Sequence, residues 1–186
     1  MKMDGFSARR TRTVGQWFRV YRLYERSFPD SERKPFPMIV KMHLKKKTDV
    51  WYFTLNGRFA GFASTINSDE LILIDYLAVS EKLRGQGAGS KAIEALKESY
   101  PDKGLYVEIE SPYEPGEDQK ERIRRKRFYE RCGMKPMNVM ANVFGVKMEL
   151  LTWNCEVDFE RYHSFYRDEY SPWAADHIIE AEHPEK

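Results

Sequence analysis

The sequence predicts an α+β protein whose helices flank a mixed, mostly antiparallel sheet with one parallel crossover pair. Three apolar, strand-like runs follow one another between residues 49 and 79, with turn signals between them. A helix-patterned run at 88–99 then separates the third strand from a further strand at 105–110. Strand–helix–strand connections are right-handed and join parallel neighbours, so the strands on either side of this helix should pair in parallel.

The first part of the chain predicts two helices joined by a stiff connector. Thr13 is placed to cap a helix that runs to Ser27, where the following Phe-Pro pair stops it. The connector at 28–37 contains three prolines and mixed charge. A second helix is expected over 38–45.

Turn residues divide the rest of the chain into strands and helices. The Asn56-Gly57 pair is a strong hairpin signal between the first two strands of the sheet. A helix over 119–132 should end at Gly133, because glycine is favoured just past a helix end. The segment 137–151 should form a final hairpin.

Length and composition indicate one globular domain spanning residues 1–186. The 31 basic and 29 acidic residues nearly balance, so the net charge of +2 gives no reason to expect a nucleic-acid partner. No apolar run is long enough to cross a membrane, and the polar start lacks the apolar core of a signal peptide, so a cytoplasmic protein without a membrane partner is expected. The two cysteines, Cys132 and Cys155, make neither a disulfide framework nor a metal site, and no histidine spacing predicts a metal.

A glycine-rich turn follows the strand that ends at Val79 and opens the helix at 88–99. Backbone N–H groups at such a turn, together with the helix dipole, favour an anion. The dinucleotide fingerprint G-x-G-x-x-G is incomplete, because Ser90 stands where the third glycine belongs. The nucleoside-triphosphate motif G-x-x-x-x-G-K-[ST] does not occur in this sequence.

Two segments resemble the signatures of the GNAT superfamily of acyl-CoA-dependent N-acetyltransferases. The pattern R-x-x-G-x-G is met by Arg84, Gly87 and Gly89 directly after a Tyr-Leu-Ala-Val strand end. Further along, the run Phe-Tyr-Glu-Arg-Cys-Gly-Met at 128–134 resembles the second signature, with the order and separation that this family uses. The resemblance covers about residues 48–152 and leaves a helical extension at 153–186.

The resemblance implies acetyl-CoA as co-substrate and assigns its binding site to two adjoining stretches. The strand end would hold the pantetheine arm through main-chain hydrogen bonds, and one N–H would polarise the thioester carbonyl. The glycine-rich turn would hold the pyrophosphate through backbone N–H groups, with an arginine adding charge. The cofactor-binding residues expected on this basis are Leu77, Ala78, Val79, Arg84, Gly85, Gln86, Gly87, Ala88, Gly89 and Ser90.

Tyr129 is the expected catalytic residue. In the matching family motif, the tyrosine just before x-x-x-Gly often reaches the CoA sulfur, and a phenol can donate a proton or a hydrogen bond to the departing thiolate. The general base stays open among several carboxylates: Glu32, Glu70, Asp75, Glu108 and Glu110.

The chain departs from the family pattern at two positions. Leu73 stands where histone-type members carry a glutamate in the central strand, which weakens a histone-type mechanism. Arg122 stands seven residues before the signature tyrosine, where many members carry an asparagine that contacts pantetheine. The arginine would meet a CoA phosphate or simply be solvated.

The expected reaction is transfer of an acetyl group from acetyl-CoA to a primary amine of a small molecule, directly in a ternary complex. Some small-amine acetyltransferases carry a Phe-Pro-x-x-Glu-Arg run like the one beginning at Phe28. A protein N-terminus or lysine side chain is the alternative acceptor. A non-catalytic acyl-CoA-binding module, which serves as a sensor or an interaction domain, is the alternative class. A homodimer built through the aromatic C-terminal segment is a further expectation, since that segment has aromatic surface to bury.

Overall fold

The computed structural model describes residues 2–3 and 5–183, and the chain packs as two compact units. The first unit comprises Met1–Asn67 and Ile74–Pro101, and the second comprises Ser68–Leu73 and Asp102–Lys186. Strand β5 (Leu71–Val79) crosses the boundary. The glycine-rich turn therefore belongs to the first unit, and the parallel strand pairing belongs to the second.

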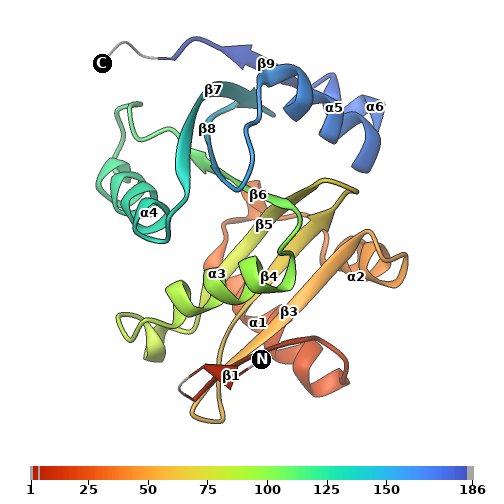
Figure 1. The fold of residues 1–186 in the computed structure, drawn as a ribbon, viewed down its shortest axis with the longest axis vertical. Coiled ribbons are helices and arrows are strands. Elements are labelled where there is room, and N and C mark those ends of the chain that lie inside the picture. Colours follow the sequence, from red (N-terminus) through yellow and green to blue (C-terminus); the bar gives the residue numbers. More distant parts are fainter. Residues whose placement is uncertain (1, 4, 184–186) are drawn as a thin grey trace. The chain divides into compact units, whose positions relative to one another are not determined.

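The first unit contains five strands and three α-helices among the residues described (Figure 1). Its strands lie in the order β1 (Lys2–Met3), β2 (Phe6–Arg10), β3 (Thr48–Leu55), β4 (Arg58–Asn67) and β5. Its helices are α1 (Val14–Ser27), α2 (Phe36–Leu44) and α3 (Ala88–Ser99), with short 3₁₀ turns η1 (Asp30–Glu32) and η2 (Glu81–Leu83).

The predicted local signals are confirmed in this unit. Thr13 caps α1 in a full capping box with Gln16, so two N–H groups that the helix leaves unpaired gain side-chain acceptors. Asn56 and Gly57 both adopt positive φ angles of 50° and 76°, as the two-residue turn between β3 and β4 requires.

Helices α1 and α2 cover one face of the strands. Val20 and Tyr24 of α1 and Ile39 of α2 join a buried cluster with residues of β3, β4 and β5. Helix α3 packs on the opposite face, where the Trp51 indole N–H of β3 donates a hydrogen bond to the Tyr100 hydroxyl just past the end of α3, at 3.3 Å. The strands are therefore covered on both faces.

The second unit contains the start of β5 and everything after α3. Its strands are β6 (Gly104–Glu110), β7 (Lys135–Val143), β8 (Val146–Trp153) and β9 (Ile178–Ala181), in the order β5-β6-β8-β7-β9. Its helices are α4 (Gln119–Arg131), α5 (Phe159–Glu169) and α6 (Pro172–Ala175).

The predicted mixed sheet is confirmed by the strand registers. β5 and β6 pair in parallel through Leu71–Gly104, Ile72–Leu105 and Leu73–Tyr106. The recorded registers of β1/β2, β2/β3, β3/β4, β6/β8, β7/β8 and β7/β9 are antiparallel.

The C-terminal extension packs within its own unit. Tyr106 of β6 contacts the rings of Tyr162 and Phe165 of α5, with centroid separations of 6.2 and 5.2 Å. These aromatic side chains are buried within their own unit, and the homodimer expected through this segment stays a prediction. The extension is also not wholly helical, because β9 adds an edge strand beside β7. No helix among the described residues has the length and apolar character needed to cross a membrane.

Candidate active site

The glycine-rich turn of the first unit connects β5 to α3. Leu83 is buried and anchors the turn, whereas Arg84 is exposed and forms no ion pair with any residue that the structure describes. Gly85 and Gly87 have φ angles of 75° and 77°, in the left-handed region that side chains disfavour. A Cβ at either glycine would meet no atom within 4 Å, so the space beside the turn is open.

Helix α3 begins at this turn without a side-chain cap. Gly87 is the N-cap residue and supplies no side-chain acceptor. The first N–H groups of a helix have no partner within the helix, so those of Ala88, Gly89 and Ser90 are available to an anion. Gln86 is turned back and donates from its side chain to the carbonyl oxygen of Lys82 at 3.0 Å. The turn therefore offers main-chain donors and open space, which suits a pyrophosphate.

The end of β5 presents two different faces. Tyr76 and Ala78 point into the core of the first unit, and the alternating residues Leu77 and Val79 are only half-buried. The N–H of Ser80, just past the strand, donates to Ala60 of β4 at 2.8 Å and holds the strand end in place. An apolar, half-buried strand edge beside an anion-binding turn suits the pantetheine arm of an acyl-CoA.

Tyr76 fixes the connector between α1 and α2 to β5. Its hydroxyl donates to the carbonyl oxygen of Glu32 at 2.9 Å and accepts from the N–H of Lys34 at 3.1 Å. The Lys34 ammonium also bonds Asp75 at 2.6 Å. Burial, followed by the charge of Asp75, raises the pKa of Tyr76 far above its usual value, so the hydroxyl stays a donor. This attachment was not predicted, because a tyrosine in a strand shows no distinctive sequence pattern.

The connector itself is held by ion pairs. The Arg33 guanidinium bonds the Glu25 carboxylate at 2.8 Å and also pairs with Asp30. Arg33 therefore has a structural role, and the Phe-Pro-x-x-Glu-Arg run is part of a well-attached segment.

Cations hold three of the five candidate bases. Asp75 is bonded by Lys34, as described above; Glu70 pairs with Arg161 at 2.7 Å, and Glu110 pairs with Arg122 at 3.0 Å. The carboxylate of Glu108 instead accepts from the Tyr166 hydroxyl at 2.8 and 2.9 Å. The choice of general base among the five carboxylates therefore stays a prediction.

Arg122, which stands where many family members carry an asparagine, is held by two ion pairs. Besides Glu110, the guanidinium bonds Asp118 at 2.8 Å. An arginine held by two carboxylates within its own unit is a structural residue, and a contact with a CoA phosphate is not needed to explain it.

Tyr129 lies near the end of α4 in the second unit. Its side chain is 7% exposed, and its hydroxyl makes no hydrogen bond to any described residue. Burial raises the pKa of Tyr129 to about 12. Gly133, at φ 76°, ends the helix, and the Met134 N–H closes the turn on Tyr129. The phenol is therefore buried and protonated, and no described residue competes for its hydroxyl.

The structure assigns the predicted residues to separate units. All ten expected cofactor-binding residues lie in the first unit, on β5, in the turn that follows it and in the first turn of α3. Tyr129 lies in the second unit, on α4.

A mixed sheet with one parallel strand pair and an uncapped glycine turn at the start of a helix are the features expected of an acyl-CoA-dependent acetyltransferase. A model of the acetyltransferase (GNAT) family matches residues 17–134. The chain therefore belongs to the GNAT acetyltransferase family.

Individual relatives support the assignment of this chain to the GNAT family. YjbC of Bacillus subtilis is 32% identical over 130 residues, which are 63% of this chain and 61% of YjbC. The solved structure of a GNAT-family protein from Bacteroides thetaiotaomicron has a TM-score of 0.71 at 21% identity and covers 88% of this chain and 98% of its own. A GNAT acetyltransferase from Elizabethkingia anophelis, solved with acetyl-CoA bound, has a TM-score of 0.58 at 17% identity and covers 82% of this chain and 100% of its own. At these identities, the two structures show likeness of fold.

Proposed function

We propose that this chain transfers an acetyl group from acetyl-CoA to the primary amine of a small molecule, directly in a ternary complex. The observation that carries the proposal is the turn from Arg84 to Ser90, where two glycines with positive φ open an uncapped helix onto free space. Family membership and a structural neighbour solved with acetyl-CoA bound support acetyl-CoA as the donor.

In the proposed reaction, backbone groups bind the donor and polarise it. The N–H groups of the turn hold the pyrophosphate, and Arg84 adds positive charge. A main-chain N–H near Leu77 or Val79 donates to the thioester carbonyl oxygen, where negative charge develops when the amine attacks. Backbone donors need only apolar side chains around them, which the end of β5 provides.

One proton transfer and one hydrogen bond complete the proposed reaction. The neutral amine nitrogen forms a bond to the acetyl carbon, and collapse of the tetrahedral intermediate breaks the carbon–sulfur bond and releases the thiolate. The amine proton passes to a carboxylate. A phenol whose pKa is about 12 is a weaker acid than a thiol of pKa about 8.5, so Tyr129 stabilises the thiolate chiefly by donating a hydrogen bond.

The small-amine acceptor rests on the connector at 28–37. This segment carries the Phe-Pro-x-x-Glu-Arg run, and Tyr24 and Tyr76 hold its Lys34 main chain by hydrogen bonds of 2.9 and 3.1 Å. A connector fixed in this way is suited to forming a rigid wall against a compact acceptor.

The test combines ligand binding with turnover. Acetyl-CoA should raise the melting temperature, because it binds the folded state, and free thiol should appear with one class of small amine. Tyr129→Phe should retain acetyl-CoA binding and lose at least tenfold in turnover, as expected for a group that acts in the chemical step. Tyr21→Phe on the exposed side of α1 is the matched control. If thiol were released with peptides and not with small amines, the acceptor would be a protein. If acetyl-CoA left the melting temperature unchanged, the proposed acetyl-CoA site would be refuted.

A further inference from the structure

Lys34 places a primary amine of the protein itself beside the strand that is proposed to bind the thioester. Its ammonium nitrogen lies 2.6 Å from the Asp75 carboxylate and 5.6 Å from the centroid of the Tyr76 ring. Both contact residues are on β5, directly before the strand end from Leu77 to Val79. Lys34, its two contacts and the glycine-rich turn all belong to the first unit.

The Lys34 ammonium lies at an edge of β5. Successive residues of a strand point to opposite faces, so a group that contacts both Asp75 and Tyr76 lies beside the edge of the strand. β4 occupies one edge, because it neighbours β5 in the sheet and the Ser80 N–H, just past β5, still donates to it. The recorded pairing with β6 ends at Leu73, so the other edge has no strand partner beyond that residue in the described part of the chain. The ammonium therefore lies at the edge whose main-chain groups are available to an acyl-CoA.

The distance from this ammonium to the proposed thioester position is short. The acetyl-CoA site proposed above has the thioester carbonyl at a main-chain N–H near Leu77 or Val79. Asp75 and Leu77 point to the same face of β5 and are about 7 Å apart, since each residue of a strand adds about 3.3 Å. Two tyrosine hydroxyls fix the main chain of Lys34, but its ammonium is carried on a flexible four-carbon stem. A change of side-chain rotamer therefore spans this distance.

Asp75 is placed to accept the proton that the ammonium must lose, because an ammonium nitrogen has no lone pair with which to attack a thioester. Transfer of one proton to the Asp75 carboxylate, 2.6 Å away, gives the neutral amine. The nitrogen then forms a bond to the acetyl carbon, and the carbon–sulfur bond breaks. The second amine proton passes to the CoA thiolate, so the products are acetyl-lysine and CoA.

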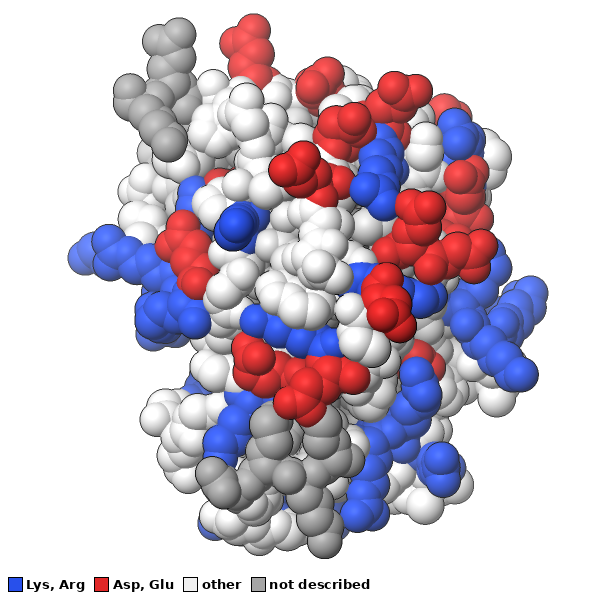
Figure 2. Space-filling model, viewed as in Figure 1, with Lys and Arg blue, Asp and Glu red and all other residues white. Residues whose placement is uncertain are grey.

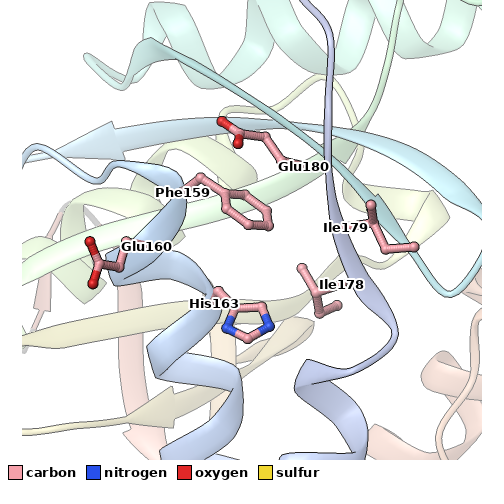
Figure 3. Close-up of a pocket in the computed structure, with 6 residues that line it drawn as sticks. All are labelled: Phe159, Glu160, His163, Ile178, Ile179 and Glu180. Carbon is pink, nitrogen blue, oxygen red and sulfur yellow. The ribbon is translucent and has the colours of Figure 1, made fainter.

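Surface lysines differ from Lys34 in exposure. Figure 2 shows Lys and Arg side chains extending from the surface, and Lys45 and Lys46 are exposed, whereas the Lys34 side chain is 27% exposed. The hollow between α5 and β9 in the second unit, shown in Figure 3, offers no amine, because no lysine is among its lining residues. Uncatalysed acetylation favours exposed amines, so preferential acetylation of Lys34 requires a donor bound beside it.

We propose that Lys34 is a self-modification site, at which acetyl-CoA bound to the glycine-rich turn of the same chain acetylates Nζ while Asp75 accepts the proton. This reaction rests on the acetyl-CoA site of the proposed function and needs no other substrate. The modification removes the positive charge of Lys34 and with it an ion pair that fastens the connector at 28–37 to β5.

The first experiment incubates the full chain with acetyl-CoA and no free amine. Mass spectrometry follows acetylation of the intact chain and of the peptides that contain Lys34 and Lys45. Lys34 should be acetylated at least tenfold faster than the exposed Lys45, because the donor is bound beside it. At a fixed acetyl-CoA concentration the rate should not change when the protein is diluted, as expected of a reaction within one chain. Equal rates at the two lysines, or a rate that falls on dilution, would overturn the proposal.

The melting temperature at the start of the incubation separates the failure of this reaction from the failure of the proposed function. A rise with acetyl-CoA and no modification of Lys34 would refute the self-modification and leave the donor site standing. No rise would refute the donor site and the self-modification with it. Acetylation of Lys34 without turnover of any free amine would support the self-modification and refute the small-amine acceptor.

Two carboxylate variants test the role of Asp75. Asp75→Asn keeps the size of the side chain and removes the proton acceptor, so acetylation of Lys34 should slow at least tenfold while acetyl-CoA still raises the melting temperature. If Asp75 only covered the ammonium, this variant would expose Lys34 and speed its acetylation, and the assignment would be overturned. Glu94→Gln removes the carboxylate from another ion pair of the first unit, 2.8 Å from the Lys97 ammonium, and should leave the rate at Lys34 unchanged. Equal slowing by Glu94→Gln would show a general effect of charge and would also overturn the assignment.

Discussion

Gly61→Ala should destabilise the first unit and disturb the strand proposed to hold the thioester. Gly61 lies on β4 against β5, and a Cβ at this position would lie 2.2 Å from the carbonyl oxygen of Ala78 and 3.1 Å from Cα of Val79. The first distance is about 1.2 Å short of the 3.4 Å at which ordinary contacts begin. Because both obstructing atoms belong to the backbone, no side-chain rotation can relieve the clash, and β5 itself must move.

The expected cost follows from this geometry. Overpacking a filled site costs about 1–3 kcal/mol, and a backbone obstacle argues for about 2–3 kcal/mol. For a chain of this length the melting temperature should fall by about 4–12 °C. Urea unfolding measures the free energy, and calorimetry with acetyl-CoA measures binding, which should weaken because Ala78 and Val79 are displaced.

Gly15→Ala on α1 is the matched control. A Cβ there meets nothing within 4 Å, and alanine is the better helix former, so stability should rise by up to about 1 kcal/mol. If Gly61→Ala changed the free energy of unfolding by less than about 0.5 kcal/mol, a typical surface value, the packing argument would be refuted.

Three further predictions concern charged and titrating groups. Lys126→Met removes the cation that lies 2.6 Å from the fully buried carboxylate of Glu149, and it should lower the free energy of unfolding in urea by about 3 kcal/mol. Adding Glu149→Leu should recover most of this loss, because no buried charge is then left unpaired. A double variant as unstable as Lys126→Met alone would contradict this reasoning. Burial opposes ionisation of Asp49, but hydrogen bonds to this carboxylate and the charge of Arg10 outweigh burial and lower the pKa of Asp49. The stability that the ionised carboxylate contributes should therefore be lost as the pH falls below about 3.8. Asp49→Asn should flatten that part of the curve of unfolding free energy against pH. Because the pKa of Tyr129 is about 12, the phenol stays protonated, and the pH profile of kcat should show no loss from this group below pH 10; a Tyr129-dependent decline near pH 8 would contradict its burial.

Local signals in the sequence predicted most of the secondary structure. The helix expected from Thr13 to Ser27 and the one expected over 88–99 match α1 and α3, because caps, periodicity and glycine act within a few residues. The hairpin at Asn56-Gly57 was equally predictable, since both positive φ angles suit those residue types. Strand β9 was missed, because a four-residue edge strand becomes stable only when β7 lies beside it.

The candidate site was predictable where backbone forms it. The turn from Arg84 to Ser90 needs glycine at defined positions, so its sequence is informative. Side-chain partners were less accessible to prediction. Arg122 binds Glu110 and Asp118, and Tyr166 bonds Glu108 from 58 residues away, and no local pattern announces either contact.

The sequence by itself therefore determined the order and type of most elements, the glycine turn and the family signatures, because these depend on conformational preferences of neighbouring residues. Only the tertiary structure decided that Lys34 pairs with Asp75 and that Tyr76 fixes the connector. These features depend on packing between segments far apart in the chain, where small differences in position decide whether two polar atoms meet.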